Sequence, residues 1–376
     1  MTLLIILAAI VAVLVLWVTG ARVAYHLADR PRLLRVPTAD GWSLSLWFRA
    51  PSQQRFAQPV VLCHGLGNNH AFFEFRGRSH LARVLADAGF QVFTMDCRGA
   101  GRTIAPEPAF AEVCVDDHVD FDVPAVLEAV REVTGQSQVL WVGHSLGGVI
   151  GVLASARKAK GRLAALVTIG SPLFFHQSAF FPRALMLAQA LAPAGQFPAR
   201  VLSTLFAPFA GFVPAPEVAR VSARVSNIDG VEQRYLLANA FADLWRGVLS
   251  QLERWIVTGR LTSSVSGEDL RTPALAITDV PTLVVGGSVD YLAPLDVTQQ
   301  FFTELQARDK ELVLVGAAFG HEVDYGHGDL IVGRDADRDV YPPIVRFLER
   351  HARPLAPSSV RDGSVPDVAP GSPSRR

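Results

Sequence analysis

The feature that most constrains the fold of this chain is an alternation of short apolar runs with segments of helical spacing. Six runs have the length and the β-branched composition of buried strands, at residues 60–63, 92–95, 139–142, 166–169, 282–285 and 311–315. Helical patterns separate several of them, for example at about 79–88 and 123–133. Strands and helices in this alternation form a mostly parallel sheet flanked by helices, so we predict an α/β fold. Upstream, the Asp40-Gly41 turn predicts a hairpin.

The composition is that of a protein with a large core and no attraction for polyanions. Half of the 376 residues are apolar, which allows one large domain or a domain that carries an insert. Lys and Arg together number 35, as do Asp and Glu, so no net charge recruits nucleic acid. The three cysteines, Cys63, Cys97 and Cys114, lack metal-ligand spacing, and we interpret them as core residues.

The first 21 residues have the composition of a membrane-spanning helix. They carry no charged side chain, and residues 3–18 form an unbroken run of 16 apolar residues. Since a span needs roughly 20 such residues, we expect a retained single-pass anchor at residues 1–21. Four basic residues follow it: Arg22, Arg30, Arg32 and Arg35. The positive-inside rule then places the body of the protein on the cytoplasmic side of the membrane. A cleaved signal peptide is the alternative, although no Lys or Arg precedes the run and the site at residues 19–21 is weak.

A serine turn stands where the strand at residues 139–142 meets the following helix. Its sequence is Gly143-His144-Ser145-Leu146-Gly147. Such a Gly-x-Ser-x-Gly turn is a sharp bend that exposes its serine at the carboxyl edge of the sheet. The start of the helix there directs backbone N–H groups and the positive end of its dipole at a developing anion. Five-residue patterns also arise by chance, so the interpretation depends on partner residues elsewhere.

The partners that a nucleophilic serine requires are present after later strands. A serine hydroxyl reacts poorly at neutral pH, so a histidine must accept its proton and a carboxylate must orient that histidine. Asp290 follows the strand at residues 282–285, and His321 and His327 follow the strand at residues 311–315. Their order along the chain, serine, acid, histidine, is the one expected for such a turn.

At these motifs the chain resembles proteins of the α/β-hydrolase fold, over roughly residues 33–352. The segments that carry the resemblance are residues 64–67, 96–101, 143–148, 286–290 and 326–336. The last is similar to the histidine segment of acid lipases and polyhydroxyalkanoate synthases, which favours His327 over His321 as the base. Synthases of that kind have cysteine at the position of Ser145, and haloalkane dehalogenases and epoxide hydrolases have aspartate there. The resemblance therefore favours ester hydrolysis.

The resemblance also implies a set of roles. The triad consists of Ser145, His327 and Asp290, and the backbone N–H groups of Leu66 and Leu146 form the oxyanion hole. No metal and no organic cofactor is implied. By the same resemblance, His64 is a structural member of its turn, and Asp96 and Arg98 support a loop beneath the site.

The insert of about 110 residues between the fourth and fifth parallel strands is where the resembled proteins carry a cap. We expect a helical cap at residues 173–279 between two core segments, 33–172 and 280–352, with a disordered tail rich in Pro, Ser and Gly at residues 354–376. Residues 235–256 have helical spacing. The first half of the cap is strongly apolar, through Phe174, Phe175, Phe180, Phe181, Leu185, Met186, Leu187, Phe206, Phe209 and Phe212. Most of these side chains pack the cap on the core, but their number favours a hydrophobic ligand such as an acyl chain.

These features together predict a membrane-anchored serine hydrolase that cleaves carboxylic esters. The expected partners are a lipid or small-molecule ester and the membrane, and not nucleic acid. Two alternatives remain open. One is an acyltransferase that uses the same triad, and the other is a non-catalytic, membrane-tethered binding protein of the same fold.

Overall fold

Eight strands form one central sheet in the computed structural model of the chain, which describes residues 2–26, 31–75, 80–106, 112–175, 180–192, 195–212 and 223–355. The strands are β1 Arg32–Pro37, β2 Ser43–Arg49, β3 Val60–Cys63, β4 Val92–Asp96, β5 Val139–His144, β6 Leu163–Ile169, β9 Thr282–Gly287 and β10 Lys310–Val315. Their order across the sheet is β1-β2-β4-β3-β5-β6-β9-β10. The predicted hairpin is β1-β2; β2 is also antiparallel to β4, and the other neighbours are parallel.

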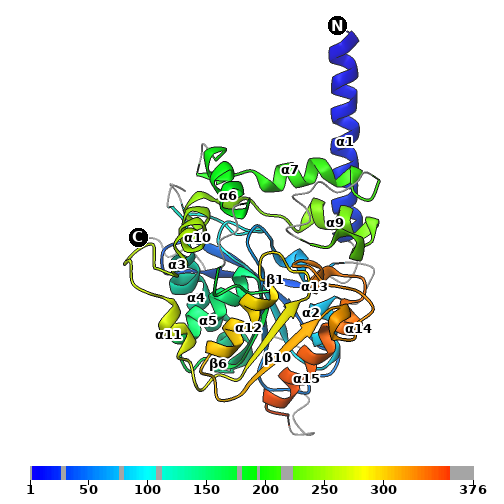
Figure 1. Cartoon of the computed structure of the whole chain (residues 1–376). Helices are drawn as coiled ribbons and strands as arrows, with labels where there is room; N and C mark the ends of the chain where they lie inside the picture. The colour runs from blue at the N-terminus through cyan, green and yellow to red at the C-terminus, as the bar shows by residue number, and fades with distance from the viewer. Residues whose placement is uncertain are drawn as a thin grey trace, which may run out of the picture.

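Helices cover both faces of this sheet because the inner strands are apolar on both sides (Figure 1). Along β3, Val61 and Cys63 belong to one core and Val60 and Leu62 to the other, as the period of two requires. The first core contains side chains of α4 (Val123–Thr134) and α5 (Leu146–Ala156). The second contains side chains of α2 (Leu81–Asp87) and α15 (Tyr341–His351). The prediction of a mostly parallel sheet flanked by helices is confirmed.

The body contains further helical segments outside the cap. They are η1 His70–Phe72, α3 Val115–Asp117, the π-helical turn η2 His118–Asp122, α12 Leu295–Glu304, η5 Ala317–Phe319, α13 Asp329–Val332 and α14 Ala336–Asp339. The loops that follow β3, β5, β6, β9 and β10 all leave the sheet at its carboxyl edge, since these strands are parallel. That edge is where ligands bind in open α/β sheets.

Most of the segment between β6 and β9 forms a cap over this edge, drawn above the sheet in Figure 1. The described elements of the cap are α6 Phe180–Ala190, β7 Gln196–Phe197, α7 Ala199–Phe206, η3 Ala207–Phe209, η4 Val225–Asn227, α9 Gly230–Asn239, β8 Leu244–Trp245 and α10 Arg246–Thr258. The last helix of the segment, α11 Arg271–Leu275, lies below the cap and packs against α5. The pattern at residues 235–256, which indicated continuous helical spacing, is two helices separated by β8. β8 pairs antiparallel with β7, so the cap contains a small ladder besides its helices.

The N-terminal segment is a helix, α1 (Thr2–His26), that projects from the body next to α7 and α9 (Figure 1). Its large apolar side chains between Ile5 and Trp17 are mostly exposed, with Leu16 at 71%. Within the part of the chain that the structure describes, no helix is both long enough and apolar enough to cross a membrane. The structure therefore does not support the expected transmembrane anchor at residues 1–21.

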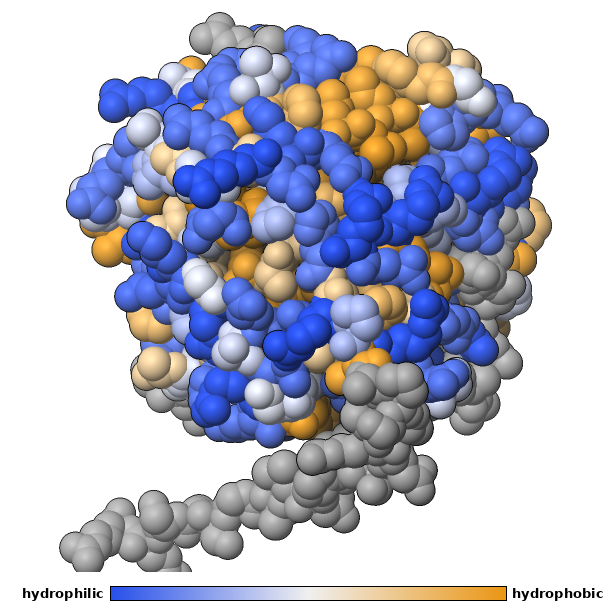
Figure 2. Space-filling view, turned by 90° about the horizontal axis from the view of Figure 1, so that it is seen from below, coloured by the Kyte–Doolittle hydropathy of each residue, from blue (hydrophilic) through white to orange (hydrophobic). Residues whose placement is uncertain are grey.

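The surface is apolar mainly on the side of α1 and the cap. Figure 2 shows the face seen from below, which is largely hydrophilic apart from limited hydrophobic areas. The cap exposes large apolar side chains from α6, α7 and the segments that follow them: Met186, Leu187, Leu191, Val201, Leu202, Leu205, Phe206, Phe209 and Phe212.

The predicted tail begins with two attached residues. Pro354 forms a bridge to Phe56, and the Leu355 amide donates to the Arg55 carbonyl at 2.8 Å. Residues 356–376 lie outside the described residues.

Candidate active site

Ser145 occupies a strained turn between β5 and α5. Its φ of 54° and ψ of −123° make it the single non-glycine residue with a positive φ in the described ranges. Backbone in this region is found almost only at glycine, and it persists where the surroundings impose it. Here the Ser145 amide donates to the Ile169 carbonyl at 2.8 Å, and the Ser145 carbonyl accepts from the amide of Gly148. The strand on one side and the helix on the other thus hold the serine at the sheet edge.

The two motif glycines allow this turn because backbone passes close to both. A Cβ at Gly143 would lie 2.3 Å from the Gly147 carbonyl oxygen, and a Cβ at Gly147 would lie 2.1 Å from the Cys63 carbonyl oxygen. Both distances are well inside van der Waals contact, so no larger residue fits. The spacing of the glycines in the sequence therefore follows from the crossing of β3, β5 and α5.

His327 and Asp290 form a buried hydrogen-bonded pair at the same edge. His327 Nδ1 lies 2.9 and 3.1 Å from the two Asp290 carboxylate oxygens. Asp290 Oδ1 also accepts from the amides of Leu292 and Ala293, at 2.8 and 2.9 Å. Because an ionised carboxylate only accepts hydrogen bonds, Nδ1 carries the proton and Nε2 of His327 is left as an acceptor. Both side chains are at most 6% exposed.

His321 does not reach this pair. Its Nδ1 lies 3.2 Å from the Gly316 carbonyl oxygen, within the loop that follows β10. It is not among the residues that line the cavity at Ser145. Of the two histidines, the structure thus brings His327 to Asp290 and leaves His321 in its loop.

Gly170 is a residue of the site that the sequence did not indicate. It directly follows β6 with a φ of 56°, and a Cβ there would lie 3.0 Å from Asp290 Oδ2 and 3.2 Å from His327 Nδ1. The absence of a side chain therefore leaves space for the hydrogen bond between these two residues. Its signal in the sequence is only a glycine after a strand, which is too common to assign.

Leu66 and Leu146, the expected donors of an oxyanion hole, both line the cavity at Ser145. Leu146 is the first residue of α5, where helix geometry leaves amide groups without an intrahelical partner. The turn that carries Leu66 approaches the serine closely, since a Cβ at Gly65 would lie 2.9 Å from the Ser145 Cβ. His64 is part of this turn: its Nδ1 donates to the Gly65 carbonyl at 2.8 Å and its Nε2 accepts from the Cys97 amide at 3.1 Å.

A large apolar cavity of about 1100 Å³ opens next to these residues. Ser145, Asp290 and His327 line it together with side chains of the cap. Of the cap residues expected to be apolar contacts, four line the cavity: Phe174, Phe175, Phe206 and Phe209. Leu185 is buried, whereas Met186, Leu187 and Phe212 are exposed. The side chains of Phe180 and Phe181 lie outside the described residues.

Asp96 fixes the segment that follows the turn of Leu66. It accepts from the His70 amide at 2.7 Å, from His70 Nδ1 at 3.0 Å and from Trp47 Nε1 at 2.9 Å. Burial acts to raise the pKa of Asp96, but the charge and hydrogen bond of His70 outweigh it and lower that pKa to about 2. The carboxylate is therefore charged at neutral pH and holds η1 against β2.

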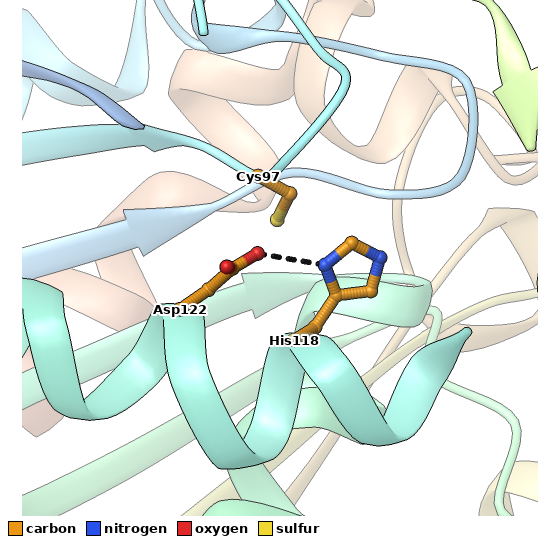
Figure 3. Close-up of side chains that lie close together, drawn as sticks. All are labelled: Cys97, His118 and Asp122. Atoms are coloured by element: carbon orange, nitrogen blue, oxygen red, sulfur yellow. Dashed lines mark hydrogen bonds and ion pairs between the residues drawn. The ribbon is translucent and has the colours of Figure 1, made fainter. Parts of the chain in front are cut away.

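A second cluster of polar side chains consists of Cys97, His118 and Asp122 (Figure 3). Their potential metal-ligand atoms lie within 4.8 Å of one another. Asp122 accepts from His118 Nδ1 at 2.8 Å and from Arg98 Nε at 2.8 Å. A cation would have to compete with the Arg98 guanidinium for this carboxylate. The Cys97 thiol is held neutral, since its hydrogen bond with Cys63 and its burial raise its pKa well above the usual range. We therefore interpret the cluster as a support for the loop after β4 and assign no metal to it.

The chain is similar to one protein family and to curated lipases. A family of proteins described as alpha/beta hydrolase fold matches residues 58–333. The gastric triacylglycerol lipase of Bos taurus is 33% identical over 135 residues, which cover 32% of this chain and 33% of the lipase. The lysosomal acid lipase/cholesteryl ester hydrolase of Homo sapiens is 34% identical over 131 residues, which cover 32% of this chain and 33% of that protein. The chain thus spans about a third of the length of these curated relatives.

Solved structures are similar over most of the chain. A carboxylesterase structure from Nitrososphaera gargenis has a TM-score of 0.58 and 16% identity, and the match covers 85% of this chain and 98% of that one. A soluble variant of the monoglyceride lipase of Saccharomyces cerevisiae has a TM-score of 0.59 and 19% identity, with 87% and 97% covered. At these identities the likeness concerns the fold alone.

Proposed function

Because the chain belongs to the α/β hydrolase fold family, we propose that it is a serine hydrolase that cleaves carboxylic esters with a hydrophobic acyl group. One observation carries the proposal: Ser145 and the hydrogen-bonded pair of His327 and Asp290 line a single apolar cavity of about 1100 Å³. The curated relatives named as lipases match a third of their length and support the same reaction class.

The proposed reaction uses the protonation states that the hydrogen bonds impose. His327 Nε2, left as an acceptor, takes the proton of Ser145 Oγ as that oxygen attacks the ester carbonyl. Asp290 stabilises the imidazolium that forms and keeps the ring oriented. The amides of Leu66 and Leu146 stabilise the oxyanion, and His327 then returns the proton to the leaving alcohol. Water hydrolyses the resulting acyl-enzyme by the same steps, and no metal or organic cofactor takes part.

The substrate class follows from the lining of the cavity. Aromatic and aliphatic side chains from α7, α9 and α10 surround the space in front of the serine, among them Phe206, Leu236 and Trp255. Burial of apolar substrate there stabilises the complex by about 25 cal/mol per Å². A long acyl chain gains more from such a lining than a short one.

We further propose that the protein attaches to a membrane through residues 1–21 and that its body lies on the cytoplasmic side. Two observations support this: the apolar side chains of α1 between Ile5 and Trp17 are exposed, and four arginines follow the apolar run. The cap lies next to α1 and exposes further apolar side chains, from α7 for example. The cavity would then stand near the lipid that supplies its substrate.

Three alanine variants test the proposed chemistry. Ser145→Ala and His327→Ala should each lose nearly all turnover of a p-nitrophenyl ester, since members of a triad act as a unit. His321→Ala is the matched control and should keep most of the activity, because its imidazole contacts the Gly316 carbonyl and not Asp290. A fluorophosphonate probe should label the wild-type chain at Ser145. Turnover by the Ser145→Ala variant at the wild-type rate would refute the assignment.

A further inference from the structure

His144 is a buried imidazole of the serine turn to which the proposed reaction gives no role. It lies between Gly143 and Ser145 at the end of β5, is 2% exposed and lines the cavity. Its Nε2 lies 3.1 Å from the backbone carbonyl oxygen of His327, which is 183 residues away in the sequence. A side chain next to the nucleophile is thus in direct contact with the backbone of the base.

The direction of this hydrogen bond is fixed by the chemistry of its partner. A carbonyl oxygen has no proton to donate, so His144 Nε2 must carry the hydrogen. Burial, together with the charge of His327 when that ring is protonated, lowers the pKa of His144 well below the usual range. The ring therefore stays neutral, and its Nδ1 is a bare acceptor.

His144 Nδ1 has no hydrogen-bond partner among the described residues, although it is fully buried. A buried acceptor left unpaired destabilises the fold. An apolar side chain at position 144 would avoid this cost, but it would leave the His327 carbonyl without the donor. The unpaired Nδ1 therefore accompanies a specific benefit, which is a hydrogen-bond donor for the His327 carbonyl.

The position of the His144 ring is itself held by packing. Its centroid lies 5.0 Å from that of Phe72 and 4.7 Å from that of the His327 ring, the latter at an interplanar angle of 50°. A ring confined between these two neighbours presents its donor in one place. The ring therefore fixes the loop that carries His327 relative to β5.

We propose that His144 is a positioning residue, which holds the backbone of His327 in place and so sets the distance from the base to Ser145. This inference rests on the proposed roles of Ser145 and His327. His144 itself exchanges no proton with the substrate. It acts on the rate of the chemical step, because a displacement of about 1 Å at a reacting group can cost about 10²-fold in rate.

Three substitutions in the full chain separate the donor from the bulk of the side chain. His144→Leu removes the donor and should lower kcat by about 10²-fold while KM stays within about twofold, because leucine fills a similar volume in the cavity wall. His144→Gln places an amide N–H near the position of Nε2 and should recover most of the lost kcat. His144→Asn is one methylene shorter, does not reach the carbonyl, and should resemble the leucine variant. The Tm of each variant shows whether it folds.

The outcomes distinguish this inference from the proposed function. Ser145→Ala is assayed in parallel, and if that variant keeps its activity the proposed function fails. If Ser145→Ala is inactive but His144→Leu has the wild-type kcat, only the role of His144 is refuted. Equal kcat values for the Gln and Asn variants would also refute it, and that comparison decides the matter if the leucine variant does not fold.

Discussion

At the scale of single residues, the pairing of His327 with Asp290 depends on a residue that has no side chain. Gly170→Ala would place a methyl group 3.0 Å from Asp290 Oδ2 and 3.2 Å from His327 Nδ1. We expect a large loss of kcat because the two side chains must move apart. A positive φ at alanine costs about 1–2 kcal/mol in addition. The matched control is Gly161→Ala, which has a φ of 73° and no atom within 4 Å of its Cβ.

These two glycine variants are compared by kcat and Tm. Both should lose stability because both place alanine at a positive φ, and Gly170→Ala should lose more because its methyl group is crowded. Only Gly170→Ala should also lose kcat. Equal kcat in the two variants would mean that the crowding at Gly170 is relieved without moving His327 and Asp290 apart.

The residues that the sequence indicated differ in kind from those it did not. Ser145, Asp290 and His327 each follow a strand and stand in a local motif, so strand order alone brought them to one edge. Gly170 and His144 act through contacts with residues more than 100 positions away. Such contacts depend on how loops from different strands meet, and no local sequence pattern predicts them.

At the scale of secondary structure elements, α7 has one side toward the cavity and another toward solvent. Leu202 lines the cavity, whereas Leu205 does not, and both belong to this helix and are at least 41% exposed. Leu202→Trp should lower kcat/KM for a decanoyl ester more than for an acetyl ester, because the added ring occupies space that a long chain requires. Leu205→Trp should leave the ratio of the two substrates unchanged. An unchanged ratio in the Leu202 variant would place the acyl chain elsewhere.

The strands were predicted closely from the sequence, but the inside of the cap was not. Apolar β-branched runs indicate buried strands directly, and six predicted runs lie within strands of the sheet. The break between α9 and α10 arises from distant contacts: the Ala242 amide donates to the Gly67 carbonyl at 2.8 Å, and Asn69 Nδ2 donates to the Asn239 carbonyl at 2.8 Å. These bonds join the cap to the turn of Leu66, and the helical spacing of residues 235–256 contains no sign of them.

At the scale of the whole molecule, the proposed attachment to a membrane predicts where the protein is found. The full chain should sediment with membranes and resist carbonate extraction, whereas a chain that starts at Val23 should be soluble. The shortened chain should still hydrolyse a soluble ester, because the sheet and both cores lie outside α1. Its activity on an ester embedded in lipid should fall further than its activity on a soluble one.

The result that contradicts this proposal is a full-length chain that stays in the supernatant. A mature protein whose N-terminus begins after Ala21 would instead identify residues 1–21 as a cleaved signal peptide. The body would then lie outside the cytoplasm.

The backbone of Ser145 implies that this protein is less stable than its fold allows. A non-glycine residue at φ 54° and ψ −123° lowers the free energy of unfolding by about 1–3 kcal/mol. Ser145→Gly relieves this strain and Ser145→Ala does not, although both remove the hydroxyl. We therefore expect two inactive variants of which the glycine one melts at the higher temperature, by a few degrees. Thermal stability and turnover would then be in direct opposition at a single position, and selection for one would act against the other.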